Sequence, residues 1–74
     1  SVVIFPNPTQ SIINVKSENS IKSIQLYDVQ GRLLQTKLTD ENSTSIDISD
    51  KSNGIYFLKI TSDKGIKVER IVKE

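Results

Sequence analysis

Turn-forming residues interrupt this sequence at intervals of roughly 8–12 residues, and this spacing constrains its fold more than any other feature. The runs between the interruptions are short and rich in β-branched residues, as in VVIF at 2–5 and IYFLKI at 55–60. No segment keeps the apolar period of about 3.6 residues that an amphipathic helix needs. The spacing therefore predicts an all-β fold, a small immunoglobulin-like antiparallel β-sandwich of about seven strands.

Composition and length agree with this fold class. Seventeen of the 74 residues are Val or Ile and none is Ala, which favours strands over helices. A chain of this length forms one domain, residues 1–74, with a core of limited size. The chain begins with Ser1 and has no signal-peptide pattern, so we expect it to be a fragment of a longer precursor.

The expected strand limits follow from the turn residues. Pro6 and Pro8 lack an N–H group and should end the first strand or place it at an edge. The polar stretches ENS (18–20) and TDENST (39–44) are predicted to be a turn and a loop. The seven expected strands cover residues 2–8, 11–17, 21–29, 32–38, 45–49, 55–60 and 66–73.

The segment 55–60 is apolar on nearly both faces. On a period of two, Tyr56, Leu58 and Ile60 share one face, and the opposite face is apolar up to Lys59. A strand of this kind is typical of the centre of a sheet, where neighbours cover both sides. The stem of Lys59 can lie on apolar surface while its ammonium group reaches water.

The spacing Gly54-x-Tyr56-x-Leu58 is typical of the tyrosine corner of immunoglobulin-like sandwiches. It predicts that Tyr56 is largely buried and that its hydroxyl bonds backbone within or near residues 49–53. The chain has no Cys and no Trp, so it is not an antibody domain.

The residue types needed for most catalytic chemistry are missing. Without His or Cys, the chain lacks the commonest general base, the thiolate nucleophile and a cysteine-based zinc site. Most of its nine carboxylates fall in turns, where they cap backbone N–H groups. The isolated Gly31, Gly54 and Gly65 do not form a phosphate-binding loop. We therefore predict that the chain is not an enzyme and takes no cofactor.

The loop DISDKSN (47–53) is the one candidate for a metal site. Asp47, Asp50 and Asn53 offer oxygen ligands for calcium, but their spacing is not that of an EF-hand. A hydrogen-bonded Asx turn fits the same residues better, and no metal site is predicted.

Charge and hydropathy argue against two further classes of partner. The net charge is +1, and five of the ten basic residues lie in the last sixteen positions. This basic charge is too small to indicate nucleic-acid binding. No apolar run is long enough to span a membrane. A terminal strand at a sheet edge could still allow weak self-association.

Four segments carry a more specific pattern: FPNPTQSIINV (5–15), IQLYDVQGRLL (24–34), ISDKSNGIYFLKI (48–60) and GIKVERIVKE (65–74). In this order and spacing they resemble the C-terminal sorting domain of cargo exported by the type IX (Por) secretion system of Bacteroidota. The resemblance covers nearly the whole chain. The motif positions it implies are Pro6, Asn7, Pro8, Asp28, Gly31, Gly54, Tyr56, Lys59, Arg70, Ile71, Val72 and Lys73.

The resemblance implies a secretion signal covalently linked to an N-terminal cargo. Its partners would be the translocon and sortase components at the outer membrane, and its route would run through the periplasm to the cell surface or the medium. The alternative is a non-catalytic immunoglobulin-like module that binds carbohydrate or protein, for which Phe5 and Tyr27 are the only plausible aromatic platforms.

The chain end suggests how such a signal would be read. A receptor could add a strand to the last segment, 66–73, with Arg70 and Lys73 providing charge at the rim. On this hypothesis, deleting residues 70–74 should block export while costing the fold comparatively little. The same motif residues could instead serve the fold, with the glycines in turns and the prolines at an edge.

Overall fold

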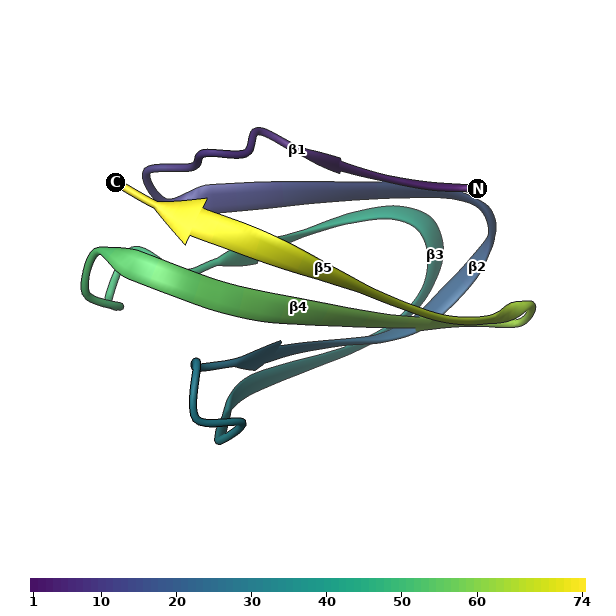
Figure 1. Cartoon of the computed structure of the whole chain (residues 1–74). Coiled ribbons are helices and arrows are strands. Elements are labelled where there is room, and N and C mark those ends of the chain that lie inside the picture. The colour runs from purple at the N-terminus through teal and green to yellow at the C-terminus, as the bar shows by residue number, and fades with distance from the viewer.

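The computed structural model describes all residues, 1–74, and consists of five strands in one sheet. All neighbouring strands are antiparallel, in the order β1-β2-β4-β5, and β3 pairs with β2. The sheet curls into a half-barrel (Figure 1). The strands are β1 (Val2–Phe5), β2 (Ile12–Tyr27), β3 (Leu33–Asp47), β4 (Gly54–Ser62) and β5 (Gly65–Lys73).

The all-β prediction is confirmed, but five strands form where about seven were expected, and they make one curled sheet. The difference lies at the polar stretches 18–20 and 39–44, which were predicted to be a turn and a loop but continue β2 and β3. The two strands bend together at this point, with register shifts that begin after Lys16.

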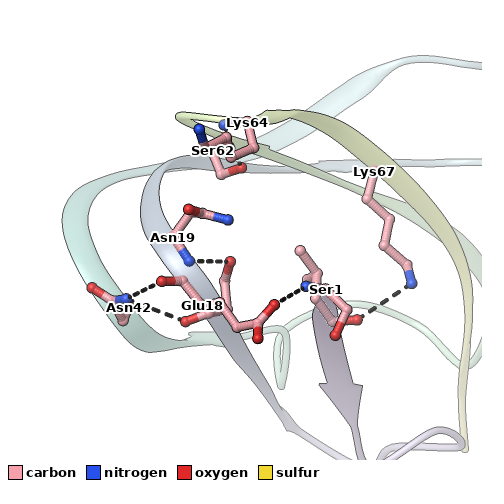
Figure 2. Close-up of polar contacts among 9 residues, drawn as sticks. Ser1, Glu18, Asn19, Asn42, Ser62, Lys64 and Lys67 are labelled. Carbon is pink, nitrogen blue, oxygen red and sulfur yellow. Dashed lines mark hydrogen bonds and ion pairs between the residues drawn. The ribbon is translucent and has the colours of Figure 1, made fainter.

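Side chains on β3 hold the shared bend of these strands together. The Asn42 amide donates to the backbone carbonyls of Ser17 (3.3 Å) and Glu18 (2.9 Å), as Figure 2 shows. The backbone N–H of Asn19 donates to the Ser17 hydroxyl at 3.1 Å. Polar residues are tolerated here because the bend is largely open to solvent, so their side chains bond the distorted backbone instead of ending the strands.

The bend folds the sheet onto itself and encloses the core. The first half of β2 pairs with β1 and the end of β3, whereas its second half pairs with β4 and the start of β3. The inner faces of the two halves, with Ile48 just after β3, supply the twelve buried apolar residues of the core: Ile4, Ile13, Val15, Ile21, Ile24, Leu26, Ile46, Ile48, Tyr56, Leu58, Ile60 and Ile71.

The alternation predicted for 55–60 is confirmed. Tyr56, Leu58 and Ile60 are all buried, and β4 lies between β2 and β5 in the sheet. The first strand ends before Pro6, as its missing N–H group requires. The β2–β3 turn needs the φ of +82° that Gly31 adopts, because side chains rarely tolerate that conformation.

No helix in the structure is long and apolar enough to cross a membrane.

Candidate functional site

The two ends of the chain meet along the outer edge of β5. The Asn7 side-chain amide donates to the Arg70 carbonyl (2.9 Å), and its oxygen accepts from the N–H of Val72 (3.0 Å). The N–H of Thr9 donates to the Val72 carbonyl (2.9 Å), and the N–H of Glu74 donates to the Thr9 carbonyl (2.8 Å). We call these four bonds the clasp. It joins two of the predicted motifs, PNP and RIVK.

The clasp works because β5 has only one strand partner. β4 occupies one edge of β5, so the backbone groups of Arg70 and Val72 point to the opposite, free edge. Pro6 and Pro8 have no N–H group to offer there. The Asn7 amide supplies both a donor and an acceptor, as a peptide group of a neighbouring strand would. Thr9 continues the pairing as a parallel bridge to Lys73.

The inward side of the chain end belongs to the core. Ile71 is fully buried against the other core residues. Lys73 is only 8% exposed, lies opposite Gly54 in the β4–β5 register, and has its Nζ 3.4 Å from Asn53 Oδ1. Arg70 lies on the outer side of the strand and is exposed. The expectation that Arg70 and Lys73 present charge at one rim is therefore wrong, because the Lys73 side chain is buried on the opposite face.

Tyr56 forms the predicted corner. Its side chain is 6% exposed, and its hydroxyl donates to the Ser52 carbonyl at 2.5 Å, within the predicted range 49–53. It faces Ile71 across the β4–β5 pair. Tyr56 therefore ties the loop before β4 to the strand that carries the chain end.

Tyr56→Phe is expected to lower the free energy of unfolding by about 1 kcal/mol, the net value of one hydrogen bond. The matched control is Tyr27→Phe, because the Tyr27 hydroxyl bonds only the Gln25 side chain, at 3.1 Å on the half-buried outer side of β2. That control should change stability less. Urea melts of both variants measure the difference, and an equal loss in the two would contradict a corner role for Tyr56.

Asp28 and Gly31 hold the β2–β3 turn. Asp28 Oδ1 accepts from the N–H groups of Gln30 (2.9 Å) and Arg32 (3.0 Å), and Asp28 Oδ2 accepts from Arg32 Nε (2.6 Å). These contacts, chiefly the backbone N–H of Arg32, hold the pKa of Asp28 below its usual value. No hydrogen bond connects this turn to the clasp.

Lys59 also lies apart from the clasp. It stands on the outer side of β4, between Gln25 and Val68 in the strand register, and its ammonium group forms no ion pair. Its side chain is half-buried among these neighbours.

The loop proposed as a metal candidate is an Asx turn. Asp47 Oδ1 accepts from the N–H of Ser49 at 2.8 Å, and this bond lowers the pKa of Asp47. Asp50 pairs with the adjacent Lys51 at 2.8 Å, which lowers the pKa of Asp50. No three acidic, His or Cys side chains gather closely enough to hold a metal ion.

Sequence reasoning missed one residue of this region, Thr9. Thr9 is almost fully buried, and its hydroxyl donates to the Ile12 carbonyl at 2.8 Å, in addition to the backbone bonds of the clasp. The one available indication for Thr9 was its position between a proline and a strand, where hydroxyl side chains often bond nearby backbone.

Comparison with known proteins identifies the chain. Residues 3–74 match the family model described as the secretion system C-terminal sorting domain. The chain is also 31% identical over 65 residues to the ulvan lyase NLR42 of Nonlabens ulvanivorans. The aligned stretch covers 85% of this chain and 12% of that protein. The chain thus spans about an eighth of the length of this relative. The chain therefore belongs to the C-terminal sorting domains of the type IX (Por) secretion system.

Proposed function

We propose that this domain carries an N-terminal cargo from the periplasm through the outer-membrane translocon, and that a sortase at the cell surface then removes the domain. Proteins with such a domain are secreted to the cell surface or beyond it, and the domain itself is a sorting signal, not a catalyst. The similarity to part of an ulvan lyase supports a secreted enzyme as the cargo.

The clasp is the observation that carries the proposal about how the signal is read. Asn7 bonds residues that are 63 and 65 positions away in the sequence, so the two end motifs exist as a unit only when the domain is folded. A receptor that requires this unit would recognise the folded domain, not a linear peptide.

The part of β5 that remains open to a receptor precedes the clasp. In a regular antiparallel pair the backbone groups alternate sides, so Ile66 and Val68 expose their N–H and C=O groups on the same free edge as Arg70 and Val72. The clasp already uses the groups of Val72 and the carbonyl of Arg70. Strand addition by the translocon is therefore expected along residues 66–70.

The two rings named for the binding-module alternative, Phe5 and Tyr27, do not form one platform. Phe5 follows the buried Ile4 on β1 and faces outward from the first half of the sheet, where Lys16 Nζ lies 5.8 Å from its ring centroid. Tyr27 lies on the outer side of the other half, next to the buried Leu26. The two rings face away from each other on opposite sides of the domain.

The test is a fusion of this domain behind a periplasm-targeted reporter in a type IX-competent host. We expect the reporter on the surface or in the medium. Val68→Pro should reduce that export while the fold survives, because proline removes only an N–H that points to the free edge. Val68→Thr keeps the N–H and is the matched control.

The outcomes separate the two parts of the proposal. If the intact fusion stays in the periplasm while native cargo is exported, the domain is not sufficient as a sorting signal. If Val68→Pro is exported as well as Val68→Thr, with both domains folded by circular dichroism, recognition does not use strand addition at this edge.

A further inference from the structure

The outer side of the four-stranded half of the sheet has an unusual composition. This outer face consists of the outward-pointing residues of four segments, 23–27, 33–38, 55–61 and 66–72. Antiparallel sheets with one solvated face normally alternate apolar inward and polar outward residues. Here the outward positions are largely apolar as well.

The strand register shows that these residues form continuous rows. Leu38 stands opposite Ser23, Ser23 opposite Thr61, and Thr61 opposite Ile66. In another row Tyr27 stands opposite Phe57, and Phe57 opposite Arg70.

Several members of the outer face are strongly exposed. Leu38 is 79% exposed, Ile66 is 61% exposed and Val68 is 58% exposed. Contiguous apolar surface of this kind marks an interaction site, whereas single exposed apolar side chains do not. Leu33, Tyr27 and Phe57 adjoin across β3, β2 and β4, and Ile55 adjoins Val72 beside them, so the apolar residues at this end of the face form one patch. Leu38 is separated from Ile66 by Ser23 and Thr61.

The charges on this face all have one sign. Lys59 and Arg70 are its only charged residues, and neither forms an ion pair. None of the nine acidic residues of the chain lies on it. By contrast, Lys22 on the neighbouring bend pairs with Asp40. The outer face therefore joins apolar surface with two cations that have no partner within the domain.

We propose that the outer face docks onto an acidic, partly apolar protein surface of the secretion machinery. This inference rests on the sorting function and names a second contact surface beside the free edge of β5. The two surfaces are continuous, because Ile66 and Val68 present backbone on the edge and side chains on the outer face. Apolar contact would supply most of the affinity, and carboxylates opposite Lys59 and Arg70 would fix the partner and its orientation.

The charge pattern selects this partner over two others. A second copy packed face to face would bring four cations together with no acidic residue between them. A lipid surface needs a cluster of basic residues, and this face has only two, with Thr, Ser and Gln between several of its apolar side chains. An acidic protein surface satisfies both the apolar rows and the unpaired cations.

The test compares two double charge reversals in the exported reporter fusion. Lys59→Glu with Arg70→Glu is expected to reduce export at least tenfold. Lys16→Glu with Lys64→Glu changes the net charge equally on exposed positions elsewhere and should leave export within twofold. Urea melts of all variants confirm that the folds are equally stable. If both pairs are exported equally well, the outer face is not the docking surface.

A photo-crosslinking amino acid at Leu38, in cells that export the fusion, identifies what covers the face. A crosslink to a secretion-machinery protein is expected, and reversing acids on that protein should restore export of the Lys59→Glu, Arg70→Glu fusion. A crosslink only to a second copy of the fusion, no crosslink at all, or binding of the purified domain to phosphatidylglycerol vesicles would overturn the proposal.

The failure of this inference differs from failure of the sorting function. If the unmodified fusion is exported but the charge reversal has no effect, only the outer-face proposal is wrong. If the unmodified fusion itself stays in the periplasm, the sorting function fails first, and both proposals fall with it.

Discussion

Deleting residues 70–74 is expected to leave the domain unfolded and to abolish export of any fusion that carries it. The deletion removes the buried Ile71, all four hydrogen bonds of the clasp and the β4–β5 pairing from Gly54 to Phe57. A domain of this length has roughly 4–11 kcal/mol of stability in total. Losing the Ile71 side chain alone costs about 2–5 kcal/mol, and each lost hydrogen bond adds about 0.5–1.5 kcal/mol.

The structure argues against the expectation that deleting residues 70–74 costs the fold comparatively little. The sequence placed a short basic segment at the terminus, and chain termini are commonly loose unless they are tied down. Here the terminus is tied down on both edges, by β4 and by the clasp. Loss of export after this deletion would therefore follow from unfolding of the domain, and it would not by itself show that a receptor binds these residues.

The matched control is deletion of Glu74 alone, which removes one hydrogen bond of the clasp and no core side chain. That variant should melt cooperatively, close to the intact domain, and be exported. Far-ultraviolet circular dichroism and urea melts of the purified domains give the stability, and the location of the reporter gives the export. A cooperative melt of the 70–74 deletion near that of the intact domain would show that the terminus is not part of the folded core.

Local patterns predicted those parts of the fold that depend on neighbouring residues. The period of two in 55–60 placed Tyr56 and Leu58 in the core, and the Gly54-x-Tyr56 spacing located the corner bond to Ser52. These features were predictable because the side chain and its partner lie within a few residues of each other, or on one strand.

The predicted number of strands was wrong because a polar stretch can either end a strand or continue it through a bend. The stretches 18–20 and 39–44 contain the Asn, Ser, Asp and Thr residues that usually form turns. In the structure they face each other across the β2–β3 pair, and Asn42 bonds the backbone on the opposite strand. Whether a polar stretch ends a strand or bends it depends on its partner about 25 residues away, which a local pattern does not contain.

The clasp was beyond local reasoning for the same reason. The motifs containing Asn7 and Arg70 could be assigned to one family by resemblance, but their contact joins residues at opposite ends of the chain. Lys73 lies on the same inward face of β5 as Ile71, two residues earlier, and it is buried there although a terminal lysine is usually solvated.

Ile71→Ala is expected to lower the free energy of unfolding by about 2–5 kcal/mol, the usual cost of emptying a buried isoleucine site. Ile71 is fully buried and faces Tyr56 across the β4–β5 pair, so the cavity would open beside the corner. Ile66→Ala, in the same strand, removes the same atoms from a side chain that is 61% exposed. It should cost less than about 1 kcal/mol, mainly through reduced strand preference.

Both substitutions remove the same atoms from one strand. The difference between their losses in free energy of unfolding therefore measures how much the burial of Ile71 stabilises the domain. Urea melts of the two variants measure it directly, provided that the slope of the transition stays constant. The Ile71→Ala fusion should lose export in proportion to the fraction that is unfolded, and a stabilising second substitution elsewhere should restore it. Equal stability losses in the two variants would mean that the terminal strand does not complete the core, and the clasp would then hold a peripheral segment instead of a structural one.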